Sequence, residues 1–141
     1  MCDRPITATE CRRRTFGLRV LAIASGALVA FGASAAADGI NPKNGSYAGT
    51  TNQGKPVSFK VSNGRVKNAK FTVYSAPCTS TFYFPGASAT INNKGKFSMS
   101  TSIATLSGKF VNRHKVNGKA TGEFQSCPGG TVTVSYTATR Q

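Results

Sequence analysis

The chain has 141 residues and carries 18 Lys and Arg against four Asp and Glu, which gives a formal net charge of +14. With one histidine and so few carboxylates, it lacks the ligands of a usual zinc, calcium or iron site and most of the residues that acid–base catalysis uses. A strongly positive field attracts polyanions and weakens with salt, and it also keeps a protein in solution.

Residues 1–37 are expected to be an export signal and not part of the folded domain. An arginine-rich flank precedes an apolar run, 20–37, that is rich in Ala, Gly and Ser and ends in an Ala-x-Ala pattern, so we expect cleavage after Ala37. The stretch Arg13-Arg14-Thr15-Phe16-Gly17-Leu18 resembles a twin-arginine signal, although Gly17 replaces the usual large apolar residue, and Sec export is the alternative. An uncleaved anchor is disfavoured because the run is poor in Leu and Ile. Either export route predicts a secreted bacterial protein.

Removing those 37 residues leaves one predicted domain of 104 residues, 38–141. This domain contains 13 Lys and Arg and two acidic residues, Asp38 and Glu123, so its formal net charge is +11. Phenylalanine and β-branched residues are abundant, Leu is rare, and no segment shows helical apolar spacing over ten residues. This composition predicts an all-β domain.

A short strand over 46–51 is followed by a hairpin between Val57 and Val73. Apolar residues alternate with polar ones on both arms, and Asn63-Gly64 supplies two residues that accept the positive φ of a tight turn. Val66 is at an even-numbered position, whereas the apolar residues that follow it, Ala69, Phe71 and Val73, are at odd-numbered positions, so regular alternation would place Val66 on the opposite face. If Val66 also points inward, an extra residue must be absorbed between Lys67 and Ala69, so we predict a β-bulge there.

Further strands are predicted at 79–84, 87–91, 96–101, 104–111, 116–125 and 131–139, separated by turns rich in Asn, Gly and Pro. The last of these has the cleanest alternation in the chain. Eight or nine short antiparallel strands of this kind predict a β-sandwich or a small β-barrel. The echoes Gly95-Lys96-Phe97, Gly108-Lys109-Phe110 and Gly118-Lys119-Ala120 suggest a hairpin repeat, but frequent Gly and Lys also produce such echoes by chance, which we favour.

Two of the four cysteines, Cys2 and Cys11, leave with the signal, and Cys78 and Cys127 remain. An even count in an exported chain predicts one disulfide between them. Closing a loop of about 50 residues stabilises a protein by roughly 4 kcal/mol in the chain-entropy model. Free or metal-binding thiols are the alternative, but no His or Asp lies nearby in the sequence.

Several stretches resemble small exported all-β domains of high-GC Gram-positive bacteria. They are Tyr47-x-Gly49-x-Thr51, the run Gln53-Gly54-Lys55-x-Val57-x-Phe59-x-Val61, the paired cysteines, and the closing Tyr136-Thr137-Ala138-x-Arg140. The likeness covers most of 38–141. It implies the fold and the exported location, and it carries no activity.

Catalysis is not expected, and neither is a cofactor or metal. A Ser-His-Asp arrangement would have to use His114, which falls in a predicted turn, with Asp38 at the new N-terminus. A glycosidase pair would have to be Asp38 and Glu123, and Glu123 lies on an outward strand position among lysines.

The basic residues are the one positive functional signal. Outward positions on four predicted strands carry Lys60, Lys96, Lys109 and Lys119, and a turn carries Arg113 and Lys115. If some of those strands are neighbours, they form a cationic stripe that could meet phosphate, uronate or sulfate groups of an anionic polysaccharide or cell-envelope polymer. Nucleic acid does not suit an exported protein, and stable membrane insertion is not expected. The alternative is a protein-interaction or structural module whose charge serves solubility alone.

Neutral sugar is a further ligand class that the sequence allows. Such sites use an exposed aromatic ring, and the chain has no Trp and four Tyr. We expect Tyr47 and Tyr136 in the core. Tyr83 has the opposite parity to Phe82 and Phe84 and is therefore the best candidate for an exposed ring.

Overall fold

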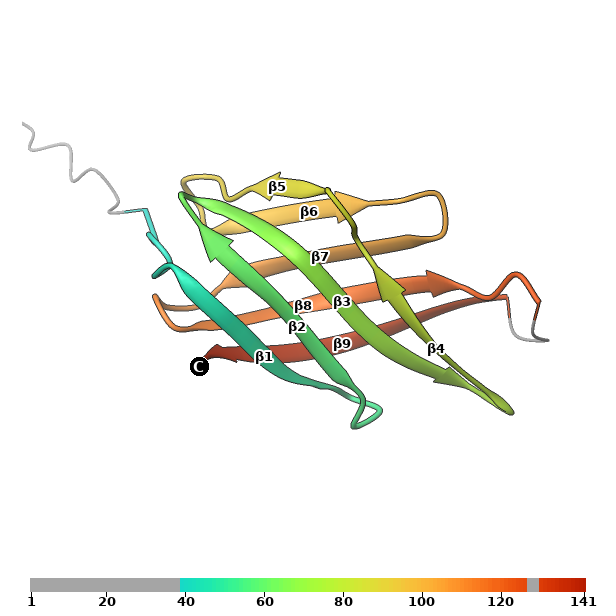
Figure 1. Cartoon of the computed structure of the whole chain (residues 1–141). Coiled ribbons are helices and arrows are strands. Elements are labelled where there is room, and N and C mark those ends of the chain that lie inside the picture. The colour runs from blue at the N-terminus through green and yellow to red at the C-terminus, as the bar shows by residue number, and fades with distance from the viewer. Residues whose placement is uncertain (1–38, 127–129) are drawn as a thin grey trace, which may run out of the picture. The chain divides into compact units, whose positions relative to one another are not determined.

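A computed structural model describes residues 39–126 and 130–141, which form nine β-strands and no helix (Figure 1). The strands are β1 (Gly45–Thr51), β2 (Pro56–Ser62), β3 (Arg65–Ser75), β4 (Cys78–Tyr83), β5 (Ser88–Thr90), β6 (Lys96–Ser100), β7 (Ala104–Phe110), β8 (Lys115–Glu123) and β9 (Thr131–Arg140). The all-β prediction is confirmed. The predicted export signal, Asp38 and Cys127 lie outside the described residues, so the signal and the Cys78–Cys127 disulfide stay predictions.

All nine strands belong to one antiparallel sheet with the order β4-β3-β2-β1-β9-β8-β7-β6, in which β5 also pairs with β3. Most strands pair with their neighbours along the chain, and β9 returns to pair with β1. The sheet curls into a half-barrel, so that β2 and β3 pass across β7, β8 and β9 (Figure 1). Of the two predicted architectures, this single curled sheet is closer to a barrel than to two separate sheets.

The hairpin of β2 and β3 has the predicted turn and the predicted bulge. Asn63 and Gly64 have φ of 50° and 69°, as a two-residue hairpin turn requires. The register shifts by one residue between Lys60–Lys67 and Ser58–Lys70, so Asn68 and Ala69 share the place opposite Phe59. Asn68 absorbs the extra residue with a φ of 50°. As a result, side chains on both sides of the bulge turn inward, and Val66 and Ala69 are both buried.

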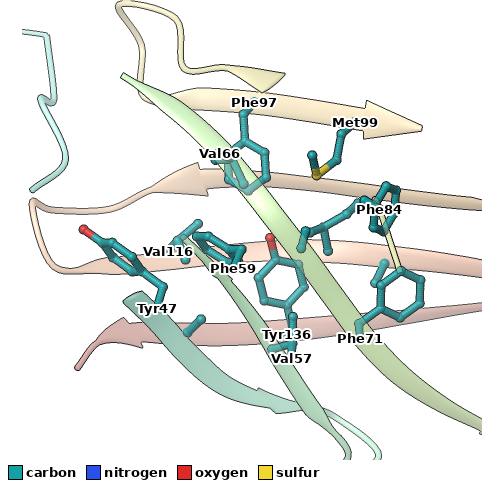
Figure 2. Packing of buried hydrophobic residues seen from close by; sticks show 14 of the residues in the cluster. Tyr47, Val57, Phe59, Val66, Phe71, Phe84, Phe97, Met99, Val116 and Tyr136 are labelled. Atoms are coloured by element: carbon teal, nitrogen blue, oxygen red, sulfur yellow. The ribbon is translucent and has the colours of Figure 1, made fainter. Parts of the chain in front are cut away.

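The core fills the concave side of the sheet with the inward side chains of both layers (Figure 2). Aromatic rings connect the layers: Phe59 of β2 stacks on Tyr47 at 5.4 Å between centroids and contacts Phe97 of β6 at 5.6 Å. Tyr47 and Tyr136 are buried as predicted, and their hydroxyls donate hydrogen bonds to backbone carbonyls. Among the described residues, no buried side-chain polar atom lacks a hydrogen-bond partner.

A pair of glycines determines how the core packs on β7 and β8. Gly108 and Gly118 are register partners, and Gly118 is in turn the partner of Tyr136. A β-carbon on Gly108 would lie 2.7 Å from the Tyr136 hydroxyl and 2.8 Å from the Phe97 ring. The rings of Tyr136 and Phe97 therefore lie directly on the glycine backbone, where any larger residue would collide with them.

Candidate functional site

The convex outer face of β6, β7 and β8 carries three lysines around a shallow hollow, which we call the basic hollow. Two cross-strand rows form its sides. Lys96, Lys109 and Asn117 are register partners in one row, and Ser98, Ser107 and Lys119 are register partners in the other. All three lysines are exposed. Lys96 on β6 and Lys119 on β8 stand at opposite corners of the hollow, and Lys109 on β7 lies in the middle of the first row.

The floor of the basic hollow is backbone. Between its two rows run Phe97, Gly108 and Gly118, whose inward positions leave only main chain on the outer face. The hollow measures about 520 Å³ and also includes Thr90, the last residue of β5, and Asn92 from the segment between β5 and β6. The glycines that accommodate the Tyr136 ring inside thus also form the depression outside.

The electrostatics of the basic hollow are uncompensated. Lys96 and Lys109 lie directly opposite each other, and like charges in that arrangement destabilise a sheet. In the described part of the chain, Glu123 is the only carboxylate side chain, and it lies at the far end of β8, opposite Thr131. Glu123 lies four positions along the strand from Lys119, which is about 13 Å at the usual rise. An anion in the hollow would therefore meet lysines with no competing local acid.

Lys60 does not belong to this surface. It lies on the outer face of β2, directly opposite Lys67 of β3, in the other layer of the curled sheet. The predicted stripe of Lys60, Lys96, Lys109 and Lys119 is thus divided, with the last three together and Lys60 apart. Alternation along each strand predicts an outward lysine correctly, but it does not reveal which strands are neighbours.

Arg113 and Lys115 lie at the hairpin end of β7 and β8 and not in the basic hollow. Arg113 is exposed in the turn, where its carbonyl accepts hydrogen bonds from the backbone amide of Lys43 and the Tyr47 hydroxyl. Lys115 opens β8 opposite Thr139, on the same outer face as Asn117. The two residues extend the positive surface beyond the first row of the hollow.

A polar hollow adjoins the basic one on the outer face of β8, β9 and β1. It measures about 430 Å³ and shares Asn117 and Gly118 with the basic hollow. Its rim consists of hydroxyl and amide side chains, chiefly Thr50, Asn52, Asn117, Ser135 and Thr137. Asn117 accepts a 3.0 Å hydrogen bond from the Thr137 hydroxyl, which links the two strands. Spacing along the chain does not predict this hollow, because the hollow depends on β9 returning beside β1.

The repeated Gly-Lys pairs are the sequence signal that marks the basic hollow. Gly95-Lys96, Gly108-Lys109 and Gly118-Lys119 supply its three lysines and both floor glycines, although the sequence analysis favoured a chance origin for these echoes. Their meaning becomes visible only in the register, where Lys96 pairs with Lys109 and Gly108 with Gly118.

The candidates for catalysis and metal binding do not come together in the described residues. His114 is exposed in the β7–β8 turn, and its carbonyl accepts a hydrogen bond from the Arg140 amide. Residues 39–126 and 130–141 contain no group of three or more His, Cys, Asp or Glu that could hold a metal ion. They also contain no helix long and apolar enough to cross a membrane.

Comparisons with known proteins give no relative: no family model, no curated protein and no solved structure matches this chain.

Proposed function

We propose that this protein is an exported, non-catalytic β-domain that binds an anionic extracellular or cell-envelope polymer through the basic hollow. The observation that carries the proposal is the directly opposed pair of Lys96 and Lys109, with Lys119 diagonal to Lys109 and, among residues 39–126 and 130–141, no carboxylate side chain beside them. A like-charged cross-strand pair costs stability unless an anion neutralises it. A hollow that gathers three such lysines is suited to a phosphate, uronate or sulfate group.

The neighbouring polar hollow supports a polymeric ligand over a single small anion. The two depressions share Asn117 and Gly118 and together run across the strands from β6 to β1. A chain of alternating anionic and hydroxylated units would place charges on the lysines and hydrogen-bonding groups on Thr50, Ser135 and Thr137.

The test is the binding of poly(glycerol phosphate) at several salt concentrations, measured by titration calorimetry. Affinity should fall steeply with salt, and the variant K96S/K109S/K119S should lose it by at least about tenfold at low salt. Each lysine that neutralises one phosphate should release roughly 0.7 counterions. Loss of all three lysines should therefore reduce the slope of log K against log salt concentration by about two.

A matched variant separates the basic hollow from the overall charge. K55S/K60S/K67S removes the same charge from β2, β3 and the turn before β2, and it should keep most of the affinity and the salt slope. Equal losses in both variants would mean that only the long-range field matters. Capture of a partner that ignores salt and both variants would favour the protein-interaction module instead.

We also propose the disulfide between Cys78 and Cys127 and the export of the chain. Phe82 of β4 lies on Gly122 and contacts Phe124 of the segment after β8 at 6.0 Å, edge to face. This packing supports the disulfide, because it holds the strand that Cys78 opens against residues shortly before position 127. A thiol assay on the unfolded, unreduced protein that detects both cysteines would contradict it, and N-terminal sequencing of secreted material tests cleavage after Ala37.

A further inference from the structure

A second set of surface residues lies on the outer face of β2, β3 and β4, in the layer without the basic hollow. Two adjoining cross-strand rows border a hollow of about 220 Å³ that we call the Tyr83 hollow. It is lined by Pro56, Ser58, Lys70, Thr72, Thr81 and Tyr83. Lys70 and Tyr83 are register partners in one row, and Thr72 and Thr81 are register partners in the other.

Tyr83 has the exposure that a stacking platform requires. Its side chain is 63% exposed, the largest value among the exposed large hydrophobic residues of the described chain. Tyr83 and Lys70 also border a second small hollow of about 200 Å³ beside Asn68 and Pro85. The phenol therefore stands between two depressions. An exposed ring on a regular strand face offers a flat apolar surface on which the ring of a ligand can stack.

The other residues of the Tyr83 hollow supply hydrogen-bonding hydroxyl groups and a positive charge. The Thr72 and Thr81 hydroxyls are 2.8 Å apart and bond to each other, and each keeps further hydrogen-bonding capacity. Lys70 is exposed, and the only carboxylate side chain in residues 39–126 and 130–141 lies on β8, in the other layer. The hollow thus combines an aromatic face, paired hydroxyls and one uncompensated ammonium group.

We propose that the Tyr83 hollow binds one pyranose ring of an acidic carbohydrate, a hexuronate unit. The C–H face of the sugar stacks on the electron-rich face of Tyr83, its carboxylate pairs with Lys70, and its hydroxyls exchange hydrogen bonds with Thr72 and Thr81. The aromatic face selects a ring over a bare phosphate chain, and the lysine selects an acidic sugar over a neutral one. The proposal does not depend on the basic hollow, which lies in the other layer.

The test is a titration of the mature protein carrying K96S/K109S/K119S with tetragalacturonate, followed by NMR shifts of the backbone amides. The triple variant removes the basic hollow, so that success or failure here is independent of poly(glycerol phosphate) binding. Amides of β3 and β4 around Lys70 and Tyr83 should shift. Tyr83→Ser should weaken binding by about tenfold or more, and Tyr83→Phe should stay within about twofold because it keeps the ring.

Two controls sharpen the assignment. Methyl-esterified tetragalacturonate keeps the rings but loses the charges, and it should bind several-fold more weakly, with no further loss in Lys70→Ser. Tyr74→Ser removes the other exposed tyrosine of this face, which is 43% exposed and lies 5.9 Å from the Lys55 ammonium, and it should bind like the parent protein.

The proposal is overturned if Tyr83→Ser binds like its parent, if the ester binds equally well, or if the shifts cluster away from β3 and β4. Misfolding would not confuse these results, because Tyr83 is exposed at the end of β4 and its replacement leaves the core unchanged. The amide spectrum of the variant verifies its fold directly.

Discussion

The ring of Tyr136 lies against Gly118, so closely that a β-carbon on the glycine would be 2.6 Å from Cζ of the tyrosine. The ring crosses β8 and its hydroxyl donates a 3.1 Å hydrogen bond to the carbonyl of Ser107 on β7. One tyrosine on β9 thereby fastens three strands on the inside, directly beneath the basic hollow.

Gly118→Ala should destabilise the domain by about 3 kcal/mol, because the added methyl group collides with the Tyr136 ring and the Ser107 carbonyl. Urea unfolding followed by circular dichroism measures the change. Ser135→Ala, an outward position on β9, is the control and should stay within about 0.5 kcal/mol. Equal stability of Gly118→Ala and wild type would contradict the close packing.

Tyr136 should give stability a specific dependence on alkaline pH. Burial raises the pKa of Tyr136 above its ordinary value of 10.0. Above pH 10 the unfolded chain ionises this phenol while the folded chain keeps the proton, so the stability it contributes is present below that pH and is lost as pH rises. The free-energy advantage of wild type over Tyr136→Phe, about 1 kcal/mol at pH 8 from the hydrogen bond, should fall by about 1.4 kcal/mol per pH unit above 10.

This comparison cancels the titration of the lysines, which both proteins share. Urea unfolding of wild type and Tyr136→Phe at pH 8 and pH 11 therefore isolates the phenol. Parallel stability curves over that range would show that the tyrosine is not shielded from water.

The bulge at Asn68 should tolerate glycine and reject a branched residue. Asn68 adopts a φ of 50° and is exposed, so its side chain matters little to the core but its backbone conformation matters. Asn68→Gly should lie within about 0.5 kcal/mol of wild type, and Asn68→Val should lose about 1 to 2 kcal/mol. Lys60→Val, at an ordinary strand position of β2, is the control and should show no such loss. Equal effects at both positions would count against the left-handed bulge.

A charge reversal should separate stability from binding. Lys109→Glu places a carboxylate opposite Lys96 and should raise the unfolding free energy by about 0.5 kcal/mol at low salt, while it abolishes binding of poly(glycerol phosphate). Lys67→Glu does the same opposite Lys60 and should give a similar gain with binding retained. If both reversals weaken binding equally, the basic hollow is not the site.

Local patterns in the sequence predicted the elements of this fold, and long-range pairing accounts for what they missed. The parity conflict at Val66 predicted the bulge because a slip of one residue turns a side chain to the opposite face, and the same alternation predicted the buried Tyr136 and the exposed Tyr83. The alternation of residues along a strand does not show which distant strands become its neighbours in the sheet. The pairing of β9 with β1 places Lys60 apart from Lys96, and no spacing along the chain specifies it.

The place of β9 has a consequence for when the domain can fold. Thr131–Arg140 is the last strand along the chain, yet it lies inside the sheet, between β1 and β8. Until those residues are available, β1 and β8 each lack one of their two partners and the sheet is divided. As the chain is synthesised, the sheet can therefore be completed only after β9 is available, which favours folding in one cooperative step after that point.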